Sequence, residues 1–176
     1  NLNEALTQFS KDRELRPDNP DTNFKLAETY HEMKSYNNAS QFYQKTIELD
    51  PNYFQAYFNL GLINAEKKQY REAVSLYQKA LSIKGDDYAT LYELGKAHEA
   101  LKDDNAAIEY YSKAIAKNPN YAKAYINLGN LYAKNNLNDK AIQQYRLAAT
   151  NDPKSYDAHF NIANAYREAK LYDEAC

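Results

Sequence analysis

Residues 125–135 read YINLGNLYAKN, with apolar side chains at the spacing of an amphipathic helix. The same stretch holds Gly129 and two asparagines, Asn127 and Asn130. Glycine in a helix interior costs about 1 kcal/mol relative to alanine, and asparagine is also a poor helix former. A helix that accepts these residues needs a reason other than intrinsic propensity.

The stretch recurs every 34 residues, at 23–33, 57–67, 91–101 and 159–169. In each copy a leucine or isoleucine is followed by a small residue, as in Leu26–Ala27, Leu60–Gly61, Leu94–Gly95, Leu128–Gly129 and Ile162–Ala163. The second half of the period repeats an alanine and, four residues later, an aromatic residue: Phe9, Tyr43, Tyr77, Tyr111 and Tyr145. Proline then closes the period at Pro17, Pro51, Pro119 and Pro153, with Gly85 in the one gap.

This 34-residue pattern resembles the tetratricopeptide repeat (TPR) family over essentially the whole chain. The resemblance implies an all-α fold of helix–turn–helix TPR units stacked into a right-handed superhelical solenoid. First helices are expected near 21–34, 55–68, 89–102, 123–136 and 157–170. Second helices are expected near 3–15, 37–49, 71–83, 105–117 and 139–150. Proline or Gly85 ends each second helix.

The repeat also explains the glycine. Gly129 is expected to let its helix approach the partner helix closely, so that residue size outweighs propensity in that column. Tyr145 and its equivalents are then expected to fill the core between the stacked helices.

The expected organisation is a single TPR array over residues 1–176. It comprises a half unit (1–19, second helix only), four full units (20–53, 54–87, 88–121 and 122–155), and a half unit (156–176, first helix and start of the second). Such a chain is expected to be a fragment of a longer array. Its end leaves Ile162, Tyr166 and Tyr172 without a covering helix, so end-to-end contacts through the terminal helices are a further expectation.

Composition argues against several classes of partner. The chain has 22 basic and 24 acidic residues and a pI of about 6.0, and no basic stripe of the kind that neutralises nucleic-acid phosphates. Mean hydropathy is −0.86, and no apolar run approaches the roughly 20 residues of a membrane span, so neither nucleic-acid binding nor membrane insertion is expected. The single Cys176 gives no disulfide framework and favours a reducing, intracellular location such as the cytoplasm.

No constellation in the sequence indicates catalysis, a cofactor or a metal. The three histidines do not converge: His98 replaces a core tyrosine, His159 opens a helix, and His31 faces the expected groove without a ligand partner at metal-like spacing. No nucleophile elbow, phosphate-binding loop or dinucleotide fingerprint occurs. We therefore expect no enzyme activity in this segment.

The TPR resemblance places partner binding on the concave face lined by the first helices. One column there is apolar in every unit (Phe24, Phe58, Tyr92, Ile126 and Phe160), and it is either exposed to a ligand or buried between first helices. Asparagine can bond both N–H and C=O of a peptide backbone, although solvation alone would also explain the asparagines. The predicted groove residues are Phe58, Asn59, Leu62, Tyr92, Lys96, Lys123, Asn127, Asn130, Phe160, Asn161 and Asn164.

The family's carboxylate clamp is not expected, because no unit has lysine in the apolar column with asparagine four residues later. The sequence favours a protein–protein interaction scaffold that binds a peptide or helical segment of a partner. One alternative is the substrate-presenting arm of a larger enzyme. One first-helix column holds asparagine at 59, 127 and 161, interrupted by Lys25 and Glu93, and this series is similar to that of O-linked N-acetylglucosamine transferases. The other is an architectural subunit of a multiprotein assembly.

Overall fold

The computed structural model describes residues 1–173, and the side chains of residues 1–169. Helices alternate with short turns throughout this part of the chain, which contains no β-strand. The first helices of the repeats are α2 (Pro20–Glu32), α4 (Phe54–Glu66), α6 (Tyr88–Ala100), α8 (Ala122–Lys134) and α10 (Tyr156–Asp173). The second helices are α1 (Leu2–Leu15), α3 (Tyr36–Leu49), α5 (Tyr70–Ile83), α7 (Asp104–Lys117) and α9 (Asn138–Asn151). The all-α prediction is confirmed.

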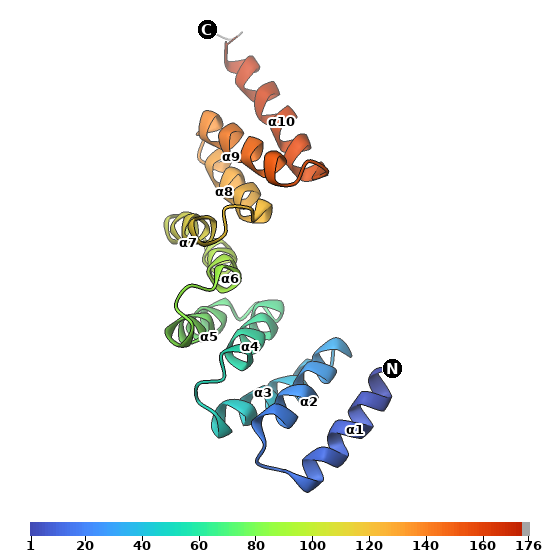
Figure 1. Cartoon of the computed structure of the whole chain (residues 1–176). Coiled ribbons are helices and arrows are strands. Elements are labelled where there is room, and N and C mark those ends of the chain that lie inside the picture. Colours follow the sequence, from blue (N-terminus) through green and yellow to red (C-terminus); the bar gives the residue numbers. More distant parts are fainter. Residues whose placement is uncertain (174–176) are drawn as a thin grey trace. The chain divides into compact units, whose positions relative to one another are not determined.

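The helices form two compact units, residues 1–85 and 86–176. In the first, α1 to α5 follow one another in chain order, and the helices of one repeat lie antiparallel (Figure 1). In the second, α6 to α9 pair in the same way, and α10 packs mainly on α9. Within each unit a helix therefore contacts its neighbours in sequence, which is the packing expected of a repeat protein.

The glycine column lies directly against the tyrosine column, as predicted. A Cβ atom built on Gly129 would lie 2.5 Å from Cε1 of Tyr145. A Cβ built on Gly61 would lie equally close to a ring carbon of Tyr77, and one built on Gly95 to ring carbons of Tyr111. Because real Cβ atoms essentially never come that close to another atom, only glycine leaves room for the ring in these three repeats. The rings are buried: Tyr77 and Tyr111 are 0% exposed and Tyr145 is 3% exposed.

The ends of the second helices agree with the proline prediction. Pro17, Pro51, Pro119 and Pro153 each lie two residues beyond the last residue of a second helix. After α5 the cap residue is Lys84 and Gly85 follows it, but Gly85 does not adopt the positive φ of a left-handed cap. The Gly85 cap geometry expected from the sequence is therefore not formed.

The first helices end two residues earlier than predicted, because each is closed by a left-handed residue. Lys34, Lys68, Lys102 and Asn136 have φ near +60°. After α2 the amide of Ser35 donates to the carbonyl of Tyr30 at 2.8 Å, and that of Lys34 donates to His31 at 2.8 Å, which is a Schellman motif. Such a cap usually uses glycine. Lysine at this position gave no sequence signal.

The last helix differs from the others. α10 continues through Lys170, the position that corresponds to Asn136, and extends to Asp173 instead of ending near residue 170. Ile162 packs against Ala141, Ile142 and Tyr145, whereas Tyr166 is 39% exposed. The side chain of Tyr172 lies outside the described residues, as does the start of the second helix predicted after it.

Candidate binding surface on the first helices

All eleven predicted groove residues lie on first helices. In the first unit, Phe58, Asn59 and Leu62 belong to α4. In the second unit, α6 carries Tyr92 and Lys96, α8 carries Lys123, Asn127 and Asn130, and α10 carries Phe160, Asn161 and Asn164. The predicted residues of each unit are therefore described as a separate surface.

The apolar column, for which the sequence left exposure and burial open, is buried at two of its five positions, partly buried at Phe58 and Ile126, and exposed at Phe160. Phe24 is 8% exposed and packs against Tyr43 and Tyr53, with ring centroids 5.6 and 4.9 Å away. Tyr92 is 9% exposed. Phe58 packs on Tyr77 at 5.9 Å and is partly covered, and only Phe160 is half exposed, at 49%. Phe24, Phe58 and Tyr92 each contact a tyrosine of the second helix in their own repeat, whereas the alternative left open by the sequence was burial between adjacent first helices.

Asn127 is held by two tyrosines. Its amide nitrogen donates to the hydroxyls of Tyr92 and Tyr111, both at 3.2 Å. The Tyr111 hydroxyl in turn donates to the Glu99 carboxylate at 2.7 Å. Because an ionised carboxylate only accepts, Tyr111 must accept from Asn127, and this fixes the orientation of the amide. The Oδ1 atom of Asn127 accepts no hydrogen bond from the described residues and is left as an acceptor.

Asn130, one turn further along α8, has the opposite polarity. Its Oδ1 accepts from the Tyr145 hydroxyl at 2.8 Å and from the Asn161 amide of α10 at 3.1 Å. Both lone-pair directions of that oxygen are therefore occupied, and the two N–H donors of Asn130 bond to no described residue. These contacts occupy some of the hydrogen-bonding groups that the sequence predicts to be available to a ligand.

The tyrosine hydroxyls keep their protons at neutral pH. Burial raises the pKa of Tyr92 and of Tyr145 to about 12. For Tyr111, burial and the hydrogen bond to Glu99 raise the pKa further still. The polarity of the asparagine–tyrosine network is therefore constant over the physiological pH range.

Charged lysine side chains lie on α8, the helix of these asparagines, and on α6, the preceding first helix. Lys96 pairs with Glu93 at 2.8 Å and lies 5.5 Å from the centre of the Tyr92 ring. Lys123 is exposed on α8. Lys134, which lies on the asparagine stripe of α8, is instead drawn to Asp104 of α7 at 2.7 Å.

In the first unit a cavity of about 360 Å³ opens between α2, the start of α3, and α4. It is lined by Glu28, His31, Glu32, Lys34, Tyr36, Tyr43, Asn59 and Glu66. Asn59 was predicted from the sequence, and His31 was expected to face the groove. Glu32, Tyr36 and Glu66 were not among the predicted groove residues, although glutamate recurs in one column at 32, 66 and 168 and tyrosine in another at 36, 70 and 172.

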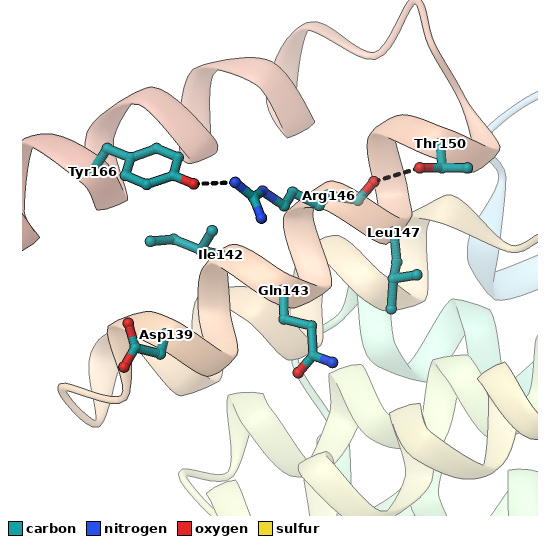
Figure 2. Close-up of a pocket in the computed structure, with 7 residues that line it drawn as sticks. All are labelled: Asp139, Ile142, Gln143, Arg146, Leu147, Thr150 and Tyr166. Atoms are coloured by element: carbon teal, nitrogen blue, oxygen red, sulfur yellow. Dashed lines mark hydrogen bonds between the residues drawn. The ribbon is translucent and has the colours of Figure 1, made fainter.

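A second cavity of similar size lies between α9 and α10 (Figure 2). Arg146 reaches across it to bond the hydroxyl of Tyr166, and Leu147 on its wall is 40% exposed. Asp139, Ile142, Gln143 and Thr150 complete the lining. Because six of its seven lining residues come from the second helix α9, this cavity is distinct from the first-helix surface.

The described residues contain no group of three or more histidine, cysteine, aspartate or glutamate side chains placed to hold a metal ion. His98 is packed as predicted: its ring stacks on Tyr110 at 5.2 Å and its Nδ1 lies 3.2 Å from Asp103. His159 is exposed, with its Nε2 3.1 Å from the carbonyl of Pro153. Among the described helices, none has the length and apolar character needed to cross a membrane.

Comparison with protein families gives matches to tetratricopeptide repeat profiles over residues 22–86, 69–122, 92–156 and 126–176. Comparison with curated proteins gives no significant match.

Solved structures give close matches. MamA is 27% identical, with a TM-score of 0.82 over 87% of this chain and 90% of that one. YrrB, described as a TPR protein with an unusual peptide-binding site, is 26% identical, with a TM-score of 0.77 over 92% of this chain and 84% of that one. A MamA fragment from Desulfovibrio magneticus RS-1 is 20% identical, with a TM-score of 0.81 over 88% of each chain, and shows the shared fold.

Proposed function

The chain belongs to the tetratricopeptide repeat family, and we propose that it binds an extended segment of a partner protein on the first helices of its second unit. Its fold is that of a protein-interaction scaffold. The surface that we propose for the peptide is centred on Asn127 and Asn130 of α8, with Asn161 and Asn164 of α10 beside them.

One observation carries this proposal. Asn127 offers an acceptor because both its N–H groups bond to tyrosines, whereas Asn130 offers donors because its oxygen is already occupied. Residues three apart on a helix lie on the same face, about 5–6 Å apart at Cβ. An acceptor and a donor at that spacing match the N–H and C=O that one residue of an extended chain presents on the same edge.

Hydrogen bonds to the peptide backbone alone would give little selectivity among the side chains of the ligand. The asparagine pair would accept many side chains but would reject a proline, or any other residue without an N–H, at the contacted position. Lys96 and Lys123 at the border of the surface would favour a ligand with acidic side chains nearby. The peptide-binding site that the description of YrrB reports supports a peptide as the type of ligand.

The test begins with a displayed library of random peptides of roughly 12 residues, long enough to span several helices. Peptides selected on the immobilised chain are labelled, and their affinity is measured by fluorescence polarisation. The double variant Asn127→Ala/Asn161→Ala should remain folded and bind about fivefold to 150-fold more weakly, since two hydrogen-bonding side chains are lost, at about 0.5–1.5 kcal/mol each. Asn105→Ala, on an exposed part of α7, is the matched control and should bind like the parent protein.

A second arm tests the backbone directly. Methylation of one peptide nitrogen at a time should abolish binding at one or two positions, whereas single alanine substitutions in the peptide should have smaller effects. Unchanged affinity of the Asn127→Ala/Asn161→Ala variant would refute the proposed surface. Sensitivity to peptide side chains alone would refute the backbone mechanism.

A further inference from the structure

We propose that the cavity between α2, α3 and α4 in the first unit binds a basic side chain, lysine or arginine, of a partner protein. The inference deepens the proposed function by assigning a charge to the partner, and it rests on the ligand being a protein segment. The cavity itself is formed entirely by residues of the first unit.

The cavity is large enough for a long side chain and combines aromatic with acidic residues. It measures about 360 Å³, and His31 and Tyr36 line it beside the glutamates. The His31 ring lies edge-on to those of Tyr36 and Tyr43, with centroids 5.8 and 6.3 Å apart. Tyr43 is 0% exposed, so Tyr36 is the tyrosine whose ring a ligand in the cavity would meet. A tyrosine ring favours an organic cation, because an ammonium or guanidinium group is attracted to its face.

The charge of the cavity lining is predominantly acidic. Glu28, Glu32 and Glu66 line the cavity, and Lys34 is the one lysine or arginine among its lining residues. Among the described residues, Glu28 and Glu32 form no ion pair, and Glu66 lies close enough to Tyr36 to raise the pKa of its hydroxyl. Burial raises the pKa of Glu28, an effect that Lys25 opposes and Glu32 reinforces. A cation entering the cavity would compensate carboxylates that the protein itself leaves incompletely paired.

The orientation of Asn59 also favours a ligand that donates hydrogen bonds. Its amide nitrogen donates to the hydroxyl of Tyr43 at 3.1 Å, so its Oδ1 is left as an acceptor at a cavity-lining position. Lysine and arginine side chains present donors only. The amide oxygen therefore adds a neutral acceptor to the carboxylates and favours a donor-rich ligand.

The acidic residues are not a requirement of the repeat. Two repeats further along the chain, the positions equivalent to Glu28, His31 and Glu32 hold Lys96, Glu99 and Ala100. The same helix pair thus also forms with a lysine at the position of Glu28. A metal ion is a poor occupant, because the described carboxylates and histidine do not converge on one point.

The experiment uses the isotopically labelled full chain and N-acetyl-arginine methylamide and N-acetyl-lysine methylamide as probes. Nuclear magnetic resonance titration should give saturable shifts at His31, Tyr36 and Asn59. The uncharged analogues with citrulline and norleucine side chains should not produce them. If only one cationic probe shifts these resonances, the pocket is specific for that side chain. Shifts of equal size with norleucine would overturn the proposal, as would no saturable shift with either cation.

Variants separate charge from folding. Glu28→Gln and Glu32→Gln should each weaken the cationic probe about twofold to fivefold, the range of single partly exposed ion pairs. Glu109→Gln, on the exposed face of α7, is the control and should have no effect. Unchanged affinity in both cavity variants would overturn the proposal. Because the groove test reads Asn127 and Asn161 in the other unit, either proposal can fail without the other.

Discussion

Replacing Gly95 by valine tests the physical basis of the repeat. The Cβ of any residue at this position would lie 2.5 Å from Cδ1 and Cε1 of Tyr111. Carbon atoms in contact prefer about 3.5–4.0 Å, so the ring would have to retreat by about 1 Å. Tyr111 cannot do so freely, because it is 0% exposed and its hydroxyl bonds to Glu99 and Asn127.

The expected magnitude follows from two opposing effects. Overpacking a well-packed site costs about 1–3 kcal/mol, whereas replacing glycine by valine in a helix regains less than about 0.5 kcal/mol. We therefore expect Gly95→Val to lower the free energy of unfolding by about 1–3 kcal/mol. For a chain of this length, that corresponds to a melting temperature about 2–12 °C lower.

The assay is thermal and urea unfolding followed by far-ultraviolet circular dichroism, with two companion variants. Gly85→Val is the control, because no atom lies within 4 Å of a Cβ at that position and its φ is not positive, so its stability should change by less than about 0.5 kcal/mol. Gly95→Ala should fall between the two, since the same column holds a fully buried Ala27 beside a fully buried Tyr43. If Gly95→Val melts together with Gly85→Val, the close-approach explanation of the column is refuted.

Three further predictions concern stability. Tyr111→Ala should lower the free energy of unfolding by about 3–5 kcal/mol, because its ring is fully buried. Tyr156→Ala, at a site 74% exposed, should change it by less than about 0.5 kcal/mol. Urea denaturation compares the two variants, and equal effects would contradict the assignment of Tyr111 to the core. Asp87→Ala should cost about 0.5–2 kcal/mol, because Asp87 caps α6 by accepting from the Thr90 amide at 2.9 Å; an unchanged urea midpoint would show that the cap is dispensable. Alkaline pH should unfold the chain: Tyr92 and Tyr145 titrate near 12 when folded but near 10 when unfolded, so their contribution is fully present below about pH 10 and is lost as pH rises toward 12. Melting temperatures measured across this range should fall steadily, and a flat profile would be inconsistent with buried hydroxyls.

The parts of the fold that repeat were predictable from the sequence. Gly61, Gly95 and Gly129 are explained by the tyrosine that each contacts, because residue size recurs at a fixed spacing. The left-handed residues were not predictable, since Lys34, Lys68 and Lys102 do not belong to the residue types that usually adopt positive φ. Their conformation follows from the Schellman hydrogen bonds and not from their own preference.

The binding surface was only partly predictable for a related reason. Sequence placed Asn127 and Asn130 on one face, but their opposite hydrogen-bonding polarity depends on Tyr92, Tyr111 and Tyr145, which approach from other helices. The acidic cavity of the first unit depends on Glu28, Glu32 and Glu66, which share a cavity only because α2 and α4 of successive repeats both line it. Contacts between helices decide both features, and a single repeat does not encode them.

The most direct test of peptide recognition is to record the side-chain amide resonances of Asn127 and Asn130 while a selected peptide is titrated into the labelled chain. The Asn130 amide protons should shift strongly as they begin to donate to a peptide carbonyl. Those of Asn127, already bonded to Tyr92 and Tyr111, should change little while a peptide N–H is protected from solvent exchange. A bound peptide that leaves both amides unperturbed would contradict the account.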